Sequence, residues 1–121
     1  MSEARAGHTS TEAAVAAFND AFGRHDVDAV MALMTDDCIF ENTLPVPDGE
    51  RVVGHAAMRA FWERFFNDSP NARFETEEMV VAGDRATVRW RFDWGSGHVR
   101  GIDLFKVRDG KVAEKLSYVK G

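Results

Sequence analysis

Residues 85–94, Arg-Ala-Thr-Val-Arg-Trp-Arg-Phe-Asp-Trp, contain the alternation that decides the fold class. Successive side chains of a β-strand point to opposite faces, so a period of two predicts a strand. Aromatic and apolar side chains fall on one face of this strand, and charged side chains fall on the other. The first set is Val88, Trp90, Phe92 and Trp94, and the second is Arg89, Arg91 and Asp93.

The same period of two continues on both sides of this strand. Gly83-Asp84, Gly95-Ser96-Gly97 and Asp109-Gly110 are signals for tight turns. We therefore expect four consecutive antiparallel strands, over residues 73–81, 85–94, 98–107 and 111–119.

Nearer the N-terminus, apolar residues recur at helical spacing. A first helix is expected after the capping pair Thr9 and Glu12, with Val15, Phe18 and Phe22 on its apolar face. A short second helix is expected to open at His25-Asp26, to bury Met34 and to end at Asp36-Asp37.

Two short strands and a third helix complete the prediction. The strands are expected at residues 38–40 and 52–53, on either side of a Pro-rich loop at 41–50. The helix carries the apolar stripe Met58, Phe61, Trp62, Phe65 and Phe66. Helices first and strands last predict an α+β fold, with the helices on one face of an antiparallel sheet.

The chain of 121 residues fits a single domain, expected over residues 9–121 after a disordered tail at 1–8. A net charge of -5 and the lack of a basic stripe argue against a nucleic-acid partner. The single cysteine, Cys38, fits a reducing compartment and is expected to fill the core. No leader and no apolar run of membrane length is visible, so we expect a cytoplasmic protein without a membrane partner.

Arg91 and Asp93 are two residues apart on one strand, so their side chains share a face and can pair. An arginine beside a carboxylate holds it ionised and oriented, as an acid–base group requires. The pattern alone favours a second interpretation, a solvated charged face opposite a buried aromatic one.

Asp103 lies within an apolar strand, where a carboxylate is rare and requires a polar partner or a function. It is either a carboxyl group in a pocket or the partner of Arg91 or Arg100 in a structural ion pair. Asn42 could place an amide at a pocket mouth or act as a turn residue ahead of the loop. Glu41 beside it is a weaker candidate for a general base.

We expect neither a metal site nor a cofactor. None of the four histidines has a second ligand at helical spacing, and no glycine-rich phosphate loop is present.

Four stretches resemble the nuclear transport factor 2-like superfamily, and within it the SnoaL-like group. They are residues 18–26, 36–42, 52–66 and above all 101–112, Gly-Ile-Asp-Leu-Phe-Lys-Val-Arg-Asp-Gly-Lys-Val. The resemblance implies a cone-shaped fold in which three N-terminal helices pack in the concave face of a curved antiparallel sheet. It also implies that this concavity is the ligand pocket and that the sheet forms a dimer.

Limonene-1,2-epoxide hydrolases of this superfamily carry an Arg-x-Asp pair, a Tyr-x-Asn ahead of a Pro-rich loop, and an Asp in the last strand. Arg91-Phe92-Asp93 matches the first motif. Phe40-Glu41-Asn42 matches the second with Phe in place of Tyr, and Ser117 stands in place of the last Asp. The resemblance implies that Asp93 is the acid–base group and that a second carboxylate is missing.

Ketosteroid isomerases carry a Tyr on the first helix, an Asp base after the first strand and a protonated Asp on a later strand. Asp103 matches the last of these, whereas Phe18 stands in place of the Tyr and Asn42 in place of the base. The sequence therefore favours hydrolase chemistry over isomerase chemistry of that kind.

The resemblance also reverses the faces of the strand at 85–94. It implies that Arg91 and Asp93 lie in the pocket, and that the aromatic residues lie outside. A homodimer through that outer face would cover Trp90, Phe92 and Trp94.

We therefore predict a SnoaL-like enzyme that acts by carboxylate acid–base chemistry on a small hydrophobic molecule, as an epoxide hydrolase or as an isomerase or cyclase. Asp93, Arg91 and Asp103 would be catalytic, with Asn42 and Ser117 as polar contacts to the substrate. The apolar wall would consist of Phe18, Phe22, Phe40, Trp62 and Phe105. The alternatives are a non-catalytic binding module and a structural dimer.

Overall fold

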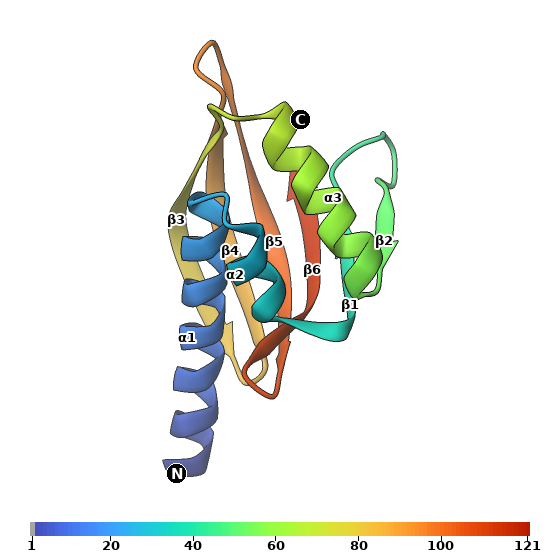
Figure 1. The fold of residues 1–121 in the computed structure, drawn as a ribbon. Coiled ribbons are helices and arrows are strands. Elements are labelled where there is room, and N and C mark those ends of the chain that lie inside the picture. Colours follow the sequence, from blue (N-terminus) through green and yellow to red (C-terminus); the bar gives the residue numbers. More distant parts are fainter. Residues whose placement is uncertain (1) are drawn as a thin grey trace.

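The computed structural model describes the backbone of residues 2–121 and the side chains of residues 10–121. Within these residues it is an α+β fold of three helices and a six-stranded sheet (Figure 1). The elements are α1 (Ser2–Gly23), α2 (Val27–Ala32), β1 (Met34–Glu41), β2 (Arg51–Val53), α3 (His55–Asp68), β3 (Arg73–Ala82), β4 (Arg85–Asp93), β5 (His98–Arg108) and β6 (Lys111–Val119).

The strands form one sheet in the order β2-β1-β6-β5-β4-β3. The meander from β3 to β6 is antiparallel, as its turn signals predict. The prediction of a wholly antiparallel sheet is wrong at one pair, because β1 runs parallel to β6. A parallel pair needs a long crossover connection, and the chain from β2 to β5 supplies it here.

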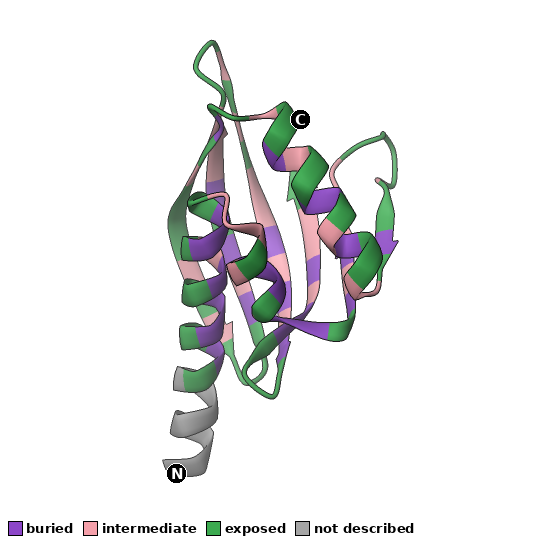
Figure 2. Ribbon diagram, in the orientation of Figure 1, coloured by how far each residue is buried: buried purple, intermediate pink, exposed green. Residues whose placement is uncertain are grey.

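All three helices lie on the same face of the sheet, which curves around them (Figure 1). Helix α1 contacts β3 to β6, and α3 contacts β1 and β2. Buried residues follow the sides of α1 and α3 that face the sheet (Figure 2). Phe22 of α1 meets Trp62 of α3 edge to face at 5.1 Å between ring centroids. Each large apolar side chain buried in this layer contributes about 1.5–3 kcal/mol.

The second helix is shorter than predicted, and the first strand is longer. Helix α2 ends at Ala32, and β1 already starts at Met34 and includes Asp36 and Asp37. Met34 is buried, but on a strand, where it lies opposite Val112. Pairing with a distant strand overrides the local helical pattern here.

The first helix starts earlier than its capping signal predicts. Helix α1 begins at Ser2, ahead of Thr9. Met1 and the side chains of residues 2–9 lie outside the described part of the chain, so the disordered tail predicted at residues 1–8 stays a prediction.

Strand β4 turns its aromatic face toward the helices. Val88 and Trp90 are buried, and the ring of Phe92 lies 6.2 Å from that of Phe65 in α3. The faces predicted from the alternation alone are therefore confirmed, and the reversal implied by the family resemblance is wrong. Burial of the aromatic side chains is favourable, whereas burial of the charged set would have to overcome their desolvation.

Over residues 2–121, the structure contains no helix with the length and apolar character needed to cross a membrane.

Candidate functional site

An inner cavity of about 70 Å³, partly open to solvent, lies between the helices and the sheet. Its polar lining comes from Asn42 and Thr43 after β1 and from Asp103, Lys115 and Ser117 on β5 and β6. The rest of the wall is apolar and consists of Phe22, Phe40, Trp62, Phe65, Phe74, Trp90, Phe92 and Val99. An apolar cavity with a few convergent polar groups is the usual form of a small-molecule site.

Asp103 and Lys115 form a buried ion pair on the wall of this cavity. Lys115 Nζ lies 3.2 Å from Asp103 Oδ2, and each side chain is 7% exposed. Ser117 donates its hydroxyl to Asp103 Oδ1 at 2.6 Å, and Lys115 donates to Ser117 Oγ at 3.3 Å. The three side chains therefore form one polar network, with a carboxylate, an ammonium and a hydroxyl.

The register of β5 and β6 brings these groups together. Asp103 lies directly opposite Ser117, and Lys115 is two residues before Ser117 on the same strand. Residues two apart share a face, so all three side chains project from the sheet toward the helices.

Aromatic rings from three elements surround the Lys115 ammonium. Its Nζ lies 4.8 Å from the ring centroid of Phe40, 5.3 Å from that of Phe22 and 5.7 Å from that of Trp62. These distances lie within the range at which a cation is attracted to the face of a ring. The cation therefore has both a carboxylate and aromatic rings as partners.

A smaller side cavity of about 30 Å³ reaches the same ion pair from α1 and β3. It shares Phe22, Phe74, Trp90, Asp103 and Lys115 with the inner cavity. Its other lining residues, mostly polar, are Asn19, Glu75, Thr76 and Val88. The ion pair is thus bordered by one mainly apolar space and one more polar space.

The polar residues predicted near the first strand separate into two groups. Asn42 lines the inner cavity, and its Oδ1 accepts a hydrogen bond from the Thr43 N–H at 2.8 Å. Glu41 instead pairs with Arg51 Nη1 at 2.7 Å, and this contact is exposed. Asn42 is therefore at the cavity, whereas Glu41 is not placed to act as its base.

The predicted apolar wall is only partly the wall of the cavity. Phe22, Phe40 and Trp62 line it. Phe18 and Phe105 are fully buried and pack edge to face at 5.7 Å between ring centroids, but they are not among the lining residues. They belong to the core between α1 and β5.

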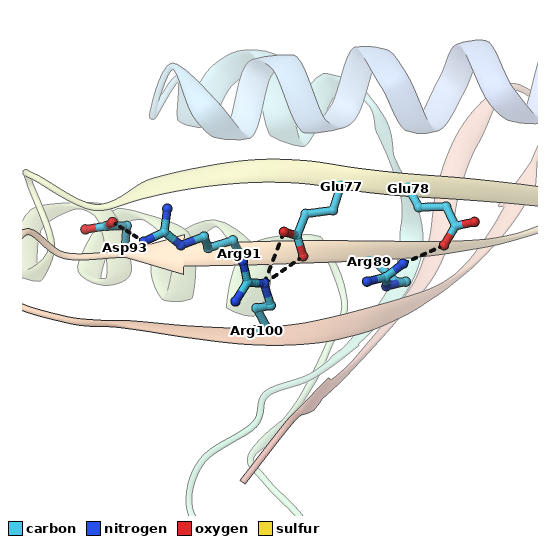
Figure 3. Close-up of polar contacts among 6 residues, drawn as sticks. All are labelled: Glu77, Glu78, Arg89, Arg91, Asp93 and Arg100. Carbon is cyan, nitrogen blue, oxygen red and sulfur yellow. Dashed lines mark hydrogen bonds and ion pairs between the residues drawn. The ribbon is translucent and has the colours of Figure 1, made fainter.

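Arg91 and Asp93 pair at 3.2 Å on the outer face of the sheet, away from the helices (Figure 3). Their side chains are 33% and 35% exposed. Asp103 lies on the opposite face and pairs with Lys115, not with Arg91 or Arg100. The pocket position that the family resemblance implies for Arg91 and Asp93 is therefore corrected.

Two further ion pairs lie beside this one on the outer face (Figure 3). Arg89 pairs with Glu78 at 2.9 Å, and Arg100 pairs with Glu77 at 3.1 Å. A bulge between Thr76 and Glu78 adds a residue to β3 at this point. The charged side of β4 is therefore part of a network of ion pairs on the outer surface of the sheet.

The predicted homodimer through this face stays a prediction, but two of the three residues proposed for its interface do not lie on the outer face. Trp90 and Phe92 face the helices and line the inner cavity, so they cannot contribute to an outer contact. Trp94, at 45% exposed, is the member of the predicted set that is open to solvent.

Sequence reasoning missed Lys115, the cation of the site. The pairing of β5 with β6 passes from Val107–Val112 to Lys106–Glu114, which leaves Ala113 as an extra residue. A one-residue shift moves the rest of a strand to the other face. The alternation Val112, Glu114, Leu116 therefore gave no sign that Lys115 points inward.

Cys38 fills the core, as predicted. It is fully buried, and burial raises the pKa of its thiol to about 11. At neutral pH it is not a thiolate nucleophile. Among the described residues, no group of three or more His, Cys, Asp or Glu side chains could hold a metal ion.

A model of the SnoaL-like domain matches residues 15–115. The chain belongs to the SnoaL-like family. No curated protein matches it.

Solved structures similar to this SnoaL-like domain extend over almost the whole chain. A nuclear transport factor 2-like protein of unknown function from Mesorhizobium loti is 43% identical, with a TM-score of 0.84, over 94% of this chain and 93% of that one.

Two more distant structures share the fold. A protein assigned provisionally as a ketosteroid isomerase, from Kribbella flavida, is 21% identical with a TM-score of 0.81, over 94% of this chain and 80% of that one. A LEH-like epoxide hydrolase from M. tuberculosis is 23% identical with a TM-score of 0.73, over 93% and 84%. The fold of this SnoaL-like domain is therefore shared by proteins with isomerase and hydrolase names.

Proposed function

We propose that the inner cavity binds a small, mostly apolar ketone or aldehyde and that the domain moves a proton at the carbon beside the carbonyl group. The observation that carries this proposal is the buried Asp103–Lys115 pair at 3.2 Å on the wall of an aromatic cavity. This is isomerase- or cyclase-type chemistry.

The two charges suit the two ends of such a reaction. The carbonyl oxygen accepts a hydrogen bond from the Lys115 ammonium, and Asp103 takes the proton from the α-carbon. Negative charge then develops on the oxygen beside a cation in a water-poor site, where it is stabilised most. In an unsaturated ketone, return of the proton to the γ-carbon moves the double bond and isomerises the substrate. Attack of the enolate carbon on a second carbonyl group of the same molecule closes a ring.

Lys115 retains a donor for this role. An ammonium has three N–H groups, and its contacts with Asp103 and Ser117 account for two of them within the described residues. Asn42 and Thr43, which also line the cavity, supply polar contacts for a second oxygen on the ligand.

Epoxide hydrolysis by two carboxylates has less support. It requires a second carboxylate beside Asp103 to activate water. Asp93 lies on the opposite face of the sheet, and position 117 is a serine that already donates to Asp103.

Exchange of α-protons for deuterium tests the proposal without knowledge of the natural substrate. Acetone, the smallest ketone, matches a cavity of about 70 Å³, and NMR in D₂O follows the loss of its α-proton signal. We expect the wild-type chain to accelerate exchange and Asp103→Asn to slow it at least about a hundredfold, because a positioned base is removed.

Asp93→Asn is the matched control, since it removes an equivalent carboxylate from the outer face. It should exchange protons at the wild-type rate. Wild-type exchange by Asp103→Asn, or equal losses in both variants, would refute the proposed base.

The second candidate is a non-catalytic binding module. Both oxygens of Asp103 already have partners, and Asn42, which follows β1 at the cavity, is an amide and not a second carboxylate. Saturable binding of the ketone without exchange in the wild-type chain would favour this candidate.

A further inference from the structure

We infer that Lys115 also reacts covalently with its ligand, forming an imine with a small aldehyde or ketone held in the inner cavity. This inference rests on the proposed function for the binding of a carbonyl compound, and it adds a nucleophile to the same site. Lys115 is the buried lysine among the four of the chain, since Lys111 and Lys120 are exposed and Lys106 is half-buried.

The charges around Lys115 do not oppose the overall reaction. An ammonium and a carbonyl group give a protonated imine and one water molecule, so the charge is +1 before and after. Asp103 at 3.2 Å and the rings of Phe40, Phe22 and Trp62 stabilise the iminium cation as they stabilise the ammonium.

The neutral amine of Lys115 forms only transiently, and the Asp103 carboxylate accepts the proton that it loses. Lys115 Nζ transfers a proton to Asp103 Oδ2, and the free amine attacks the carbonyl carbon to form the C–N bond. The carbonyl oxygen takes up that proton, and a second one from the nitrogen through Asp103 or Ser117 Oγ. The C–O bond then breaks, and the oxygen leaves as water.

The side cavity suits the release of this water. It borders Asp103 and Lys115, and Asn19 and Thr76 supply polar contacts along it. The inner cavity retains the apolar part of the ligand, so water and ligand do not compete for the same space.

Reductive trapping tests the inference on the full chain. The protein is incubated with acetone and sodium cyanoborohydride at neutral pH and then digested. Peptide mass spectrometry follows each lysine. We expect a secondary amine on Lys115 to form on the order of a hundredfold faster than on Lys111 or Lys120, because a bound carbonyl is already positioned for attack. Urea-unfolded protein should lose this preference.

Two substitutions test whether the fast adduct depends on the amine of Lys115. Lys115→Arg keeps a cation beside Asp103 but cannot form an imine, and it should abolish the fast adduct. Lys111→Arg, on the exposed part of β6, should leave labelling of Lys115 unchanged. Circular dichroism of both variants checks that they are folded.

An unmodified Lys115 at saturating acetone, or labelling no faster than that of the exposed lysines, overturns the inference. If ketone binding and Asp103-dependent proton exchange persist in that case, the proposed function survives without the imine. If neither binding nor exchange is seen, both proposals fail.

Discussion

Lys115 Nζ and Asp103 Oδ2 lie 3.2 Å apart inside the domain, on neighbouring strands that also direct Ser117 to the same point. A buried pair of this kind depends on both partners, because each charge has lost its water. The stability and the chemistry of the site therefore rest on the same contact.

Lys115→Met should lower the free energy of unfolding by about 3–5 kcal/mol, because it leaves Asp103 buried without a counter-charge. Urea denaturation followed by circular dichroism measures the change. The double variant Asp103→Leu/Lys115→Met, which leaves no charge, should be more stable than Lys115→Met alone. A single variant that unfolds like the wild type would show that the pair is not desolvated.

The contact between Lys115 and the aromatic rings should give a measurable interaction free energy. In a double-mutant cycle, Phe40→Leu and Lys115→Met should deviate from additivity by about 0.5–2 kcal/mol, since both remove the cation–ring contact at 4.8 Å. Phe61→Leu is the control, because Phe61 packs on Phe40 but is not one of the three rings around Lys115. Equal coupling at both positions would mean that general packing, not the cation, is measured.

Gly101 allows strand β5 to pass beneath the indole of Trp90. A Cβ at this position would lie 2.4 Å from Trp90 Cζ2 and 2.2 Å from the Tyr118 carbonyl oxygen, and the backbone cannot yield as a flexible side chain would. Gly101→Ala should therefore cost about 1–3 kcal/mol of stability. A thermal melt tests this against Gly23→Ala, where a Cβ meets nothing within 4 Å. Similar melting temperatures for the two variants would contradict the close approach.

Because the Cys38 thiol is buried, we expect the protein to lose stability at alkaline pH. Burial raises its pKa from 9.0 to about 11 in the folded chain, so between these values the unfolded chain loses the thiol proton and the folded chain keeps it. The contribution is fully present below pH 9 and is lost as pH rises toward 11. Urea unfolding of the wild type and Cys38→Ala across this range should show a steeper decline in the wild type. Parallel curves would mean that the thiol titrates alike in both states.

The four strands of the meander and the faces of β4 could be predicted from the sequence, because alternation and turn residues act between neighbours in the chain. The apolar stripes of α1 and α3 follow from helical spacing in the same way. Residue chemistry also singled out Asp103, since a carboxylate in an apolar strand needs a partner.

Only the tertiary structure decided how these elements meet. The parallel pairing of β1 with β6 joins segments separated by most of the chain, and pairing there converts the predicted end of the second helix into strand. The partner of Asp103 depends on a single extra residue, Ala113, which turns Lys115 inward. The outer position of Arg91 and Asp93 reflects which side of the sheet the helices cover.

By itself, the sequence determined an α+β domain with helices on one face of a strand meander, and a carboxylate among its apolar residues. The tertiary structure decided which cation pairs with this carboxylate, Asp103: it is Lys115, and not Arg91 or Arg100. The physical reason is that local periodicity reports which residues share a face. Strand register and packing, which depend on distant residues, determine which face becomes the interior and which charges must pair there.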